Sequence, residues 1–179
     1  MADCDTGRKT PSHQGGFLLD GGVHFVAALR LLLGSANEKL ASLVSFTALL
    51  RPALPPVDTI QAIAKTEAGA TGTITLSFGT EFKSGLEVEI VTTRGAVLWN
   101  PRLVTVTTKD KVTGEKVEES EELGQDSGVK AEVAAWAASI ARGEADVRQT
   151  PREALRDLEV VQRLLESGER GGVVVALEG

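Results

Sequence analysis

The stretch Gly69–Thr80, GATGTITLSFGT, decides the class of fold, because apolar residues alternate with small hydroxyl-bearing residues along it. Ile74, Leu76 and Phe78 fall at every second position. Successive side chains of a strand point to opposite faces, so this alternation predicts a strand with one buried face. The stretch Leu86–Ile90, LEVEI, repeats the pattern. The two together predict a mostly antiparallel sheet with one buried face.

On both sides of these two stretches, further segments have patterns that favour strands. In total we predict five or six strands in a meander. These further segments are Val44–Leu50, Thr59–Thr66, Ala96–Trp99 and Leu103–Thr108. The acidic run Glu115–Asp126 is interpreted as a solvated strand end and loop. Gly69–Gly72 is interpreted as a turn between strands and not as a phosphate-binding loop, because no helix follows it.

Helical patterns flank the strands. An almost continuous apolar run, Gly21–Leu33, predicts a largely buried helix that stops at Gly34. A second helix is predicted over Gly128–Arg142, with one apolar stripe. Thr150, Pro151 and Glu153 form a capping box that starts a third helix. The stripe of the second helix consists of Val129, Val133, Trp136 and Ile140, and the predicted buried face of the third of Leu155, Leu158, Val161 and Leu165. A short apolar run, Val173–Leu177, predicts a last strand or tail.

This order predicts one α+β domain over residues 1–179, with a mostly antiparallel, open-faced sheet and helices packed on one face. The other face carries polar residues in the best strands. They are Thr73, Thr75, Ser77, Glu87 and Glu89. Such a face is left either to water or to a partner subunit.

Bulk composition excludes several classes of protein. A formal net charge of −6 over 179 residues argues against a nucleic-acid partner, which would require a surplus of Lys and Arg. The single cysteine, Cys4, permits no internal disulfide and favours a reducing compartment. The apolar run from Phe17 to Leu33 contains Asp20, His24 and Arg30, so we do not expect it to span a membrane. No secretory signal pattern is present at the N-terminus, and the expected location is the cytoplasm.

The residues that could carry chemistry lie in Gln14–Phe25, QGGFLLDGGVHF. Asp20 and His24 are four residues apart at the start of the predicted buried helix, a spacing that places both side chains on one face. A histidine can take or give a proton to a substrate hydroxyl near neutral pH, and a nearby carboxylate can orient the ring. The pair therefore suits acid–base catalysis.

Two structural alternatives stand beside this interpretation. Asp20 could cap the helix, as Asp often does, and His24 could be a hydrogen-bonded core histidine. The glycine pairs that bracket the two residues, Gly15–Gly16 and Gly21–Gly22, favour a functional role, because a cap does not require them and glycine allows close approach of backbone or ligand. A metal site built from Cys4, His13, Asp20 and His24 has no recognised ligand spacing, and we expect none.

The stretch Gln14–Phe25 resembles the start of the C-terminal domain in the glucose-fructose oxidoreductase and inositol dehydrogenase (Gfo/Idh/MocA) family. Gly69–Thr80 and the helix sequence REALRDLEVVQRLLESG are similar to later landmarks of that family, so the resemblance covers essentially the whole chain. It implies an N-terminal Rossmann domain that binds NAD or NADP. It further implies that His24 is the acid–base group for the substrate hydroxyl, with Asp20 assisting, and that Arg8 and His13 lie near the substrate.

The sequence also departs from the family pattern. It has no G-x-G-x-x-G after a strand and no Glu-Lys-Pro motif, so the dinucleotide-binding domain is expected to be absent and the chain is not expected to bind NAD(P) alone. The leading hypothesis is the substrate-side domain of an NAD(P)-dependent oxidoreductase acting on a secondary alcohol of a sugar, polyol or dihydrodiol, inactive alone and paired with a second copy through the open sheet face. The alternatives are a non-catalytic oligomerisation or scaffold domain and a truncated gene product.

Overall fold

The computed structural model describes residues 16–124 and 128–177, and its chain divides into two compact units. The first unit comprises the chain up to Glu81 together with the chain from Ala145 onward, and the second runs from Phe82 to Glu144. Each unit is an assembly of antiparallel strands and helices, so the α+β class predicted from the sequence is confirmed. The described strands form two four-stranded sheets, and their number exceeds the five or six that the alternation indicated.

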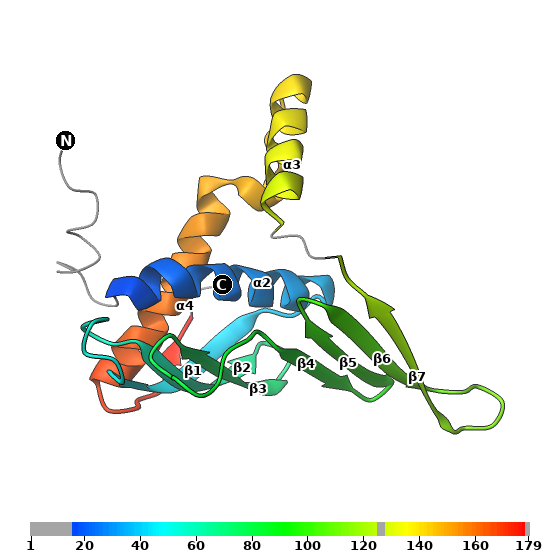
Figure 1. Ribbon diagram of the computed structural model, residues 1–179, viewed down its shortest axis with the longest axis horizontal. Coiled ribbons are helices and arrows are strands. Elements are labelled where there is room, and N and C mark those ends of the chain that lie inside the picture. Colours follow the sequence, from blue (N-terminus) through cyan, green and yellow to red (C-terminus); the bar gives the residue numbers. More distant parts are fainter. Residues whose placement is uncertain (1–15, 125–127, 178–179) are drawn as a thin grey trace. The chain divides into compact units, whose positions relative to one another are not determined.

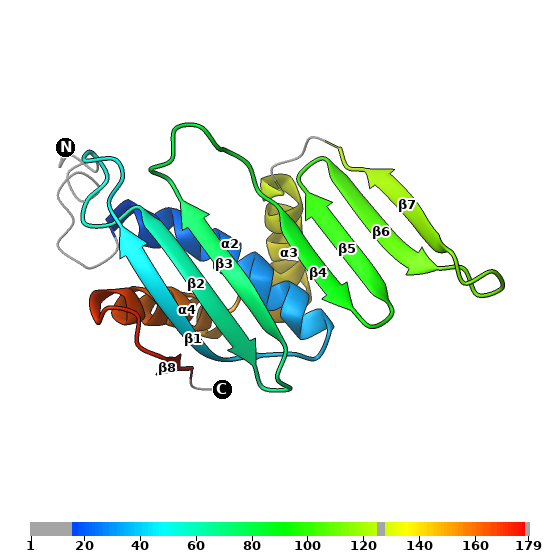
Figure 2. The ribbon, with the colours of Figure 1, turned by 90° about the horizontal axis from the view of Figure 1, so that it is seen from below.

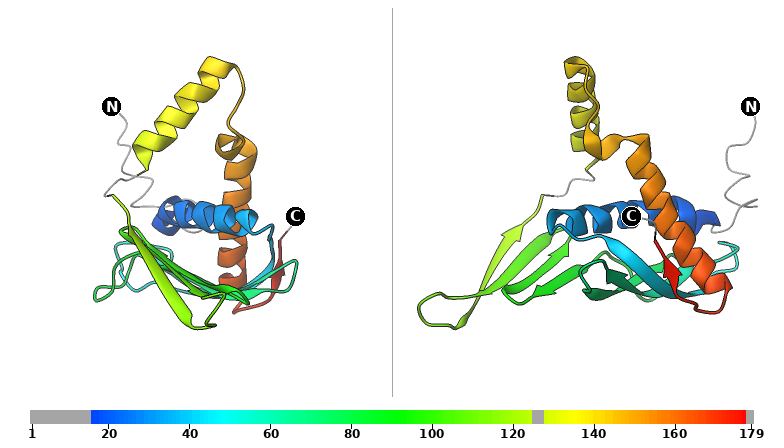
Figure 3. Two further views of the ribbon diagram at one scale, coloured as in Figure 1. Left: turned by 90° about the vertical axis from the view of Figure 1, so that its right-hand side faces the viewer. Right: turned by 180° about the vertical axis from the view of Figure 1, so that it is seen from behind.

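The first unit contains a sheet of order β3-β2-β1-β8, in which all neighbours are antiparallel (Figures 1 and 2). Its elements are α2 (Gly16–Ser35), β1 (Leu40–Ala48), β2 (Thr59–Thr66), β3 (Thr71–Ser77), the 3-10 turn η1 (Val147–Gln149), α4 (Pro151–Glu169) and β8 (Val175–Ala176). The long helices α2 and α4 pack on the same face of this sheet (Figures 2 and 3).

The core of the first unit lies between that sheet and the two helices. The strict alternation of β2, in which buried and exposed residues exchange at almost every position, supplies its centre. The buried apolar residues are Leu18 and Val26 of α2, Leu43 of β1, Ile60, Ala62 and Ala64 of β2, Leu76 of β3, and Val160, Val161, Leu164 and Leu165 of α4. Each of these positions follows from a period of two in a strand or near 3.6 in a helix.

Hydrogen bonds between two buried serine hydroxyls and backbone groups fix the end of α4 on β1. The Ser167 hydroxyl accepts a hydrogen bond from the Ser45 backbone N–H at 2.8 Å and donates one to the Val173 carbonyl at 2.6 Å. The Ser45 hydroxyl donates to the Leu164 carbonyl. Gly168 lies where a methyl group would overlap the Thr47 side chain, so helix and strand approach closely there.

The second unit contains a meander of order β4-β5-β6-β7, with antiparallel pairing throughout. Its elements are β4 (Val88–Thr92), β5 (Gly95–Asn100), β6 (Leu103–Lys109), β7 (Lys116–Glu122) and α3 (Val129–Arg142). The acidic run predicted as a solvated strand end forms the edge strand β7, in which every residue is exposed. Charged side chains on an exposed edge oppose pairing with further strands.

The predicted buried face of α4 is wrong in part. Val161 and Leu165 are buried as predicted, but Leu155 is 67% and Leu158 41% exposed, because the first turns of the helix rise away from the sheet (Figure 3). The apolar stripe of α3 is exposed along its whole length. Periodicity identifies an apolar face, but a neighbouring element is needed to bury it.

Helix α2 is, among the described residues, the helix long and apolar enough to cross a membrane by length and composition, with a mean hydropathy of 1.6. A helix that packs in the core of a protein passes the same test. Leu18 is fully buried and Val26 is 1% exposed against the first sheet, and Arg30 forms ion pairs with α4. These contacts hold one side of α2, but only Leu18, Gly22 and Val26 of its 20 residues are buried, so the prediction of a largely buried helix is wrong.

Candidate active site on helix α2

Asp20 and His24 lie one turn apart on α2, and both side chains are exposed. Leu31, two turns beyond His24, continues the same exposed row and is 63% exposed. The opposite side of the helix carries Leu18 and Val26, which are buried. The spacing of four residues therefore brings the acid and the imidazole together on one face, while the apolar face holds the helix to the sheet.

The two structural alternatives for this pair do not fit the structure. The helix begins at Gly16, so Asp20 lies in its second turn and cannot be its N-cap. His24 is exposed and is not a core histidine. The predicted start at Gly21 is wrong because Gly21 and Gly22, which usually interrupt helices, lie within the helix here.

Gly21 is required by an aromatic ring, and this explains one of the bracketing glycines. A Cβ at Gly21 would lie 2.8 Å from Cζ of Phe78, whereas a Cβ at Gly22 would meet nothing closer than the Leu76 side chain at 3.6 Å. The Phe78 ring packs edge-on against Phe17, with ring centroids 5.1 Å apart. Glycine at 21 thus lets the helix approach the sheet, so its role here is packing and not the approach of a ligand.

Phe25 lies on the other side of the Phe78 ring, with centroids 6.3 Å apart. The Phe78 ring is therefore held between two aromatic residues of α2, spaced eight positions apart, and it covers the glycine between them. Aromatic pairs in such arrangements contribute about 0.5–1.5 kcal/mol beyond area burial. The Phe78 ring therefore sets the distance between α2 and the sheet, close to the helix face that carries His24.

A buried carboxylate holds the backbone beneath Phe78. Asp58 has no exposed surface, and its two carboxylate oxygens accept hydrogen bonds from the Leu50 N–H at 3.0 Å and the Arg51 N–H at 2.7 Å. The Thr59 hydroxyl donates to the same carboxylate at 2.9 Å. The Asp58 carbonyl accepts from the Phe78 N–H at 2.9 Å.

Asp58 therefore ties the β1–β2 loop to the end of β3, directly below α2. Gly79 packs against the Asp58 carboxylate so closely that a Cβ there would overlap it. Asp58 was not predicted to have a role, and Phe78 was predicted only as an alternating residue of a strand. The available signal was an Asp between a proline-rich loop and an alternating strand, a place where a carboxylate commonly accepts backbone N–H groups.

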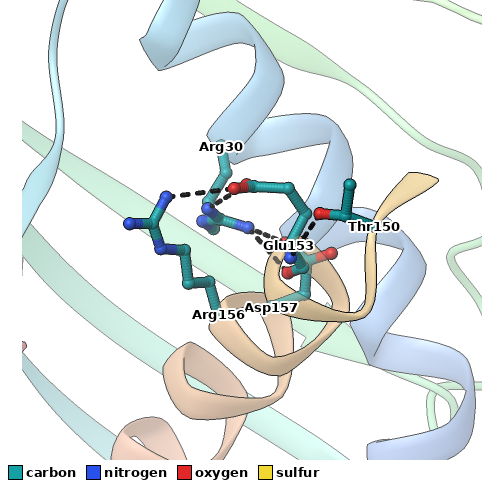
Figure 4. Close-up of polar contacts among 5 residues, drawn as sticks. All are labelled: Arg30, Thr150, Glu153, Arg156 and Asp157. Atoms are coloured by element: carbon teal, nitrogen blue, oxygen red, sulfur yellow. Dashed lines mark hydrogen bonds and ion pairs between the residues drawn. The ribbon is translucent and has the colours of Figure 1, made fainter. Parts of the chain in front are cut away.

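Arg30 connects α2, the helix that carries Asp20 and His24, to α4 (Figure 4). Its guanidinium pairs with the Glu153 carboxylate at 2.8 Å and with the Asp157 carboxylate, and it donates to the Glu153 carbonyl at 3.2 Å. The hydrogen bond from Arg30 lowers the pKa of the Glu153 carboxyl, and the positive charge of Arg156, 3.0 Å away, adds to this effect. The Thr150 hydroxyl caps α4 through the Glu153 N–H, as the capping box predicted.

The remaining predicted site residues cannot be placed. Arg8, His13 and Cys4 lie outside the described residues. Within the part of the chain that the structure describes, no group of three His, Cys, Asp or Glu side chains could hold a metal ion. The site thus consists of Asp20 and His24 on a rigidly seated helix, an arrangement that can exchange a proton with a bound hydroxyl and orient a second one.

Comparisons with known proteins identify the family of the chain. The model of the oxidoreductase family C-terminal alpha/beta domain (Gfo/Idh/MocA) matches residues 6–177. Dehydrogenase FPY6 of Fusarium mangiferae is 46% identical over 165 residues, which make up 92% of this chain and 47% of that protein. An oxidoreductase from Thermotoga maritima has a similar structure, with a TM-score of 0.77 at 28% identity over 95% of this chain and 47% of that one.

Levoglucosan dehydrogenase in complex with NADH and levoglucosan shares the fold, with a TM-score of 0.75 at 14% identity over 99% of this chain and 56% of that one. This chain spans about half the length of the relatives that it matches. The family model, the dehydrogenase relative and the fold all lead to one assignment. The chain belongs to the Gfo/Idh/MocA oxidoreductase family and corresponds to its C-terminal α/β domain.

Proposed function

We propose that this chain is the substrate-side domain of an NAD(P)-dependent oxidoreductase that acts on a secondary alcohol of a sugar, polyol or dihydrodiol. The observation that carries the proposal is the exposed pair Asp20 and His24, one turn apart on a helix whose other face carries the buried residues Leu18, Gly22 and Val26. Family membership supports the class of reaction. The complex of levoglucosan dehydrogenase with NADH and levoglucosan supports the cofactor and a sugar-like substrate.

In this proposal His24 handles the proton of the reacting hydroxyl. Its imidazole accepts that proton when the alcohol is oxidised and returns it when the ketone is reduced. Asp20 orients the imidazole or accepts a hydrogen bond from a neighbouring hydroxyl of the substrate. Removing a general base of this kind slows catalysis by about 10²–10⁴-fold. Because both side chains are exposed, the pair is accessible to a substrate bound over this face of α2.

The residues described do not fit a dinucleotide. Such a site uses a glycine-rich turn between a strand and the N-terminus of a helix. The glycine-rich segment Gly69–Gly72 instead joins β2 to β3 as a hairpin, with no helix after it. NAD or NADP, which would supply the electron-pair transfer, is therefore assigned to the half of the relatives that this chain does not match. The chain alone is expected to be inactive.

The test joins this chain behind the unmatched half of the Fusarium dehydrogenase and compares the fusion with the chain alone. NAD⁺ and NADP⁺ reduction is measured on a panel of sugars and polyols that includes levoglucosan. We expect turnover by the fusion only, and a loss of about 10²–10⁴-fold on His24→Ala, with a smaller loss on Asp20→Asn. Val112→Ala, at a 93% exposed position of the β6–β7 hairpin, is the matched control.

Two outcomes would contradict the proposal. Turnover that survives His24→Ala unchanged would remove this residue from the chemistry. A fusion that binds NADH but turns over none of the alcohols, while it remains folded, would favour a non-catalytic scaffold. Since His24 is exposed, its replacement should change the free energy of unfolding by no more than about 0.5 kcal/mol, so loss of activity cannot be attributed to misfolding.

The uncovered face of the first sheet supports a second part of the proposal, which is pairing with another copy of this chain. Helices cover only the opposite face, and on this one Phe46 is 63% and Ile63 57% exposed. Val44 lies directly opposite Ile63 in the register, so the apolar side chains adjoin. Thr73 and Thr75 extend the same face with small polar groups.

Sedimentation velocity tests this pairing. The wild-type chain should sediment as a dimer or larger species at micromolar concentration, and Ile63→Lys should give a monomer because it buries an unpaired charge in the interface. Val112→Lys makes the same apolar-to-charged change in the β6–β7 hairpin, which belongs to the other unit, and it should leave the mass unchanged. A wild-type monomer at all concentrations would exclude the pairing.

The proposed location is the cytoplasm. The lone Cys4 offers no internal disulfide, which suits a reducing compartment. Export of the protein in fractionated cells would contradict this.

A further inference from the structure

Asp58 is a fully buried carboxylate that the proposed chemistry does not use. Burial of a charge is costly unless hydrogen bonds compensate it, so a carboxylate in such a place needs a dedicated set of donors. Three donors surround it here, and they are the N–H groups of Leu50 and Arg51 and the hydroxyl of Thr59. Asp58 and these partners all belong to the first unit. The first unit thus holds a buried charge whose only visible task is to fix the chain around it.

The residues on both sides of Phe78 are held by this carboxylate and its neighbour. The hydroxyls of Thr59 and Ser77 lie 2.7 Å apart, and because the Thr59 proton goes to Asp58, Ser77 is the donor in this pair. Gly79 packs on the carboxylate itself. Between them, the Phe78 N–H donates to the Asp58 carbonyl at 2.9 Å. Three consecutive residues at the end of β3 are therefore fixed by Asp58 and Thr59.

The fit between the carboxylate and the strand end is close. A Cβ at Gly79 would overlap both carboxylate oxygens of Asp58. The φ angle of Gly79 lies outside the left-handed region, so other residues could adopt this backbone and only the carboxylate requires glycine here. A displacement of the carboxylate should therefore displace the end of β3 as well.

The Phe78 ring carries any such displacement to α2. A Cβ at Gly21 would lie 2.8 Å from Cζ of Phe78, and two aromatic residues of α2 flank the ring. Gly21 follows Asp20 directly and precedes His24 by three positions, so the ring supports the turn of α2 that carries the acid and the imidazole. Movement of the ring must either move this turn or leave a gap beneath it.

We infer that Asp58 is a positioning residue for the face of α2 that carries Asp20 and His24. It acts through Phe78 and touches neither substrate nor cofactor. The inference deepens the proposed function, and its kinetic consequence rests on that function. A misplacement of reacting groups by about 1 Å can cost about 10²-fold in rate, so the loss of this support should lower turnover by more than a change in stability explains.

The kinetic test uses the fusion of this chain with the unmatched half of the Fusarium dehydrogenase. Asp58→Asn keeps the shape of the side chain and removes its charge. We expect kcat to fall by at least about tenfold, and the KM for the dinucleotide to stay within about twofold, because that site is assigned to the other half. Asp110→Asn is the matched control, since Asp110 also accepts two backbone N–H groups but in an exposed hairpin. Rates are compared at a temperature at which circular dichroism shows each variant to be folded.

A second background separates positioning from stability. In His24→Ala, the imidazole that Asp58 is inferred to position is absent. Asp58→Asn should then lower the residual turnover by less than about twofold, compared with about tenfold or more in the presence of His24. A purely structural role of Asp58 would lower turnover by the same factor in both backgrounds.

A measurement on the chain alone does not depend on turnover. The α-protons of Gly21 lie beside the Phe78 ring and sense its ring current, and [2-13C]glycine labelling makes them visible by NMR. Their signals are assigned by their absence in Gly21→Ala, and Phe78→Leu gives their position without the ring. We expect Asp58→Asn and Gly79→Ala to move these signals at least about halfway to that position. Gly72→Ala, in β3 where a Cβ would meet nothing within 4 Å, should leave them in place.

Gly79→Ala retains the carboxylate and only displaces it, so it carries both tests if Asp58→Asn does not fold. If neither variant folds, Ser77→Ala, which removes one hydroxyl at a half-buried position, should move the Gly21 signals in the same direction. Unmoved Gly21 signals in a folded variant would overturn the inference.

An unchanged kcat in an active fusion, or equal losses with and without His24, would also overturn the inference. A folded wild-type fusion without turnover on any alcohol would contradict the proposed function instead. The Gly21 signals would then decide by themselves whether Asp58 positions this face of α2.

Discussion

Replacement of Gly21 by Ala tests whether the Phe78 ring sets the position of the helix that carries Asp20 and His24. Ala is favoured over Gly in a helix interior by about 1 kcal/mol. At position 21 the new methyl group would lie 2.8 Å from Cζ and 3.2 Å from Cε1 of Phe78, which is closer than van der Waals contact allows. The ring cannot easily move aside, because Phe17 and Phe25 flank it.

Overpacking of this kind costs about 1–3 kcal/mol. The net effect of Gly21→Ala is therefore a loss of about 0–2 kcal/mol in the free energy of unfolding. Gly22→Ala is the matched control, since its methyl group would meet Leu76 at 3.6 Å and Leu18 at 3.8 Å, both ordinary contacts. That variant should gain up to about 1 kcal/mol from helix propensity. Propensity cancels in the comparison, so the two variants should differ by about 1–3 kcal/mol.

Urea unfolding followed by circular dichroism at 222 nm measures both free energies. A third variant, Phe78→Leu, makes the test specific to the ring. In the wild type, Phe78→Leu should lower the free energy of unfolding, because aromatic contacts are lost. In the Gly21→Ala background the same change should lower the free energy of unfolding by at least about 1 kcal/mol less, or even raise it, because the clash is relieved. Equal stability of Gly21→Ala and Gly22→Ala, or additive effects of Gly21→Ala and Phe78→Leu, would refute the idea that Phe78 determines the height of α2.

Three further predictions concern the polar contacts around the site. Arg30→Gln removes the ion pairs to Glu153 and Asp157 and should lower the free energy of unfolding by about 1–2 kcal/mol. The control is Arg156→Gln, which removes an exposed partner of Glu153 and should change the free energy of unfolding by less than about 0.5 kcal/mol. The hydrogen bond from Arg30 lowers the pKa of the Glu153 carboxyl in the folded protein. The stabilisation by the ion pair is therefore present above the unfolded-state pKa of about 4.3 and is lost as the pH falls through the lower folded-state pKa. Between about pH 6 and pH 3, the free energy of unfolding should fall less in Arg30→Gln than in the wild type. Ser167→Ala leaves the buried Ser45 N–H without its acceptor and should lower the free energy of unfolding, measured in urea, by about 1–3 kcal/mol. The control is Ser35→Ala, which removes an exposed hydroxyl and should leave the free energy of unfolding nearly unchanged. Asp58→Asn places an amide among three donors and should cost about 2–3 kcal/mol by the same measurement. The control is Asp110→Asn, because Asp110 also accepts two backbone N–H groups but lies in an exposed hairpin, and its replacement should cost clearly less. Equal losses would show that burial of Asp58 is unimportant.

Much of the secondary structure follows from local patterns. The alternation in Gly69–Thr80 and in Leu86–Ile90 predicts strands where the structure has Thr71–Ser77 and, two residues later than predicted, Val88–Thr92, since a period of two is a property of the extended chain alone. Thr150 with Glu153 predicts the start of α4 to the residue, because a capping hydroxyl and the N–H three positions later are neighbours in any helix. The spacing of Asp20 and His24 predicts a shared face for the same reason.

The errors arise where a distant part of the chain decides. Glycine at 21 and 22 predicted a helix boundary, but the ring of Phe78, more than fifty positions away, occupies the space that a side chain would need, so the helix passes through both glycines. Leu155 and Leu158 lie on the apolar face of α4 as their period requires, yet both are exposed, because the first turns of α4 rise away from the sheet (Figure 3).

The sequence by itself determined which segments are helices and strands, where several of them end, and that an acid and an imidazole share one face of α2, because these properties depend on neighbours within four positions. Only the tertiary structure decided that this face is exposed and that the apolar stripe of α3 is exposed as well. It also decided that Phe78 packs against α2 and that Asp58 binds the backbone of Phe78. The physical reason is that burial belongs to a contact between two surfaces, and the second surface comes from residues that no local pattern can identify.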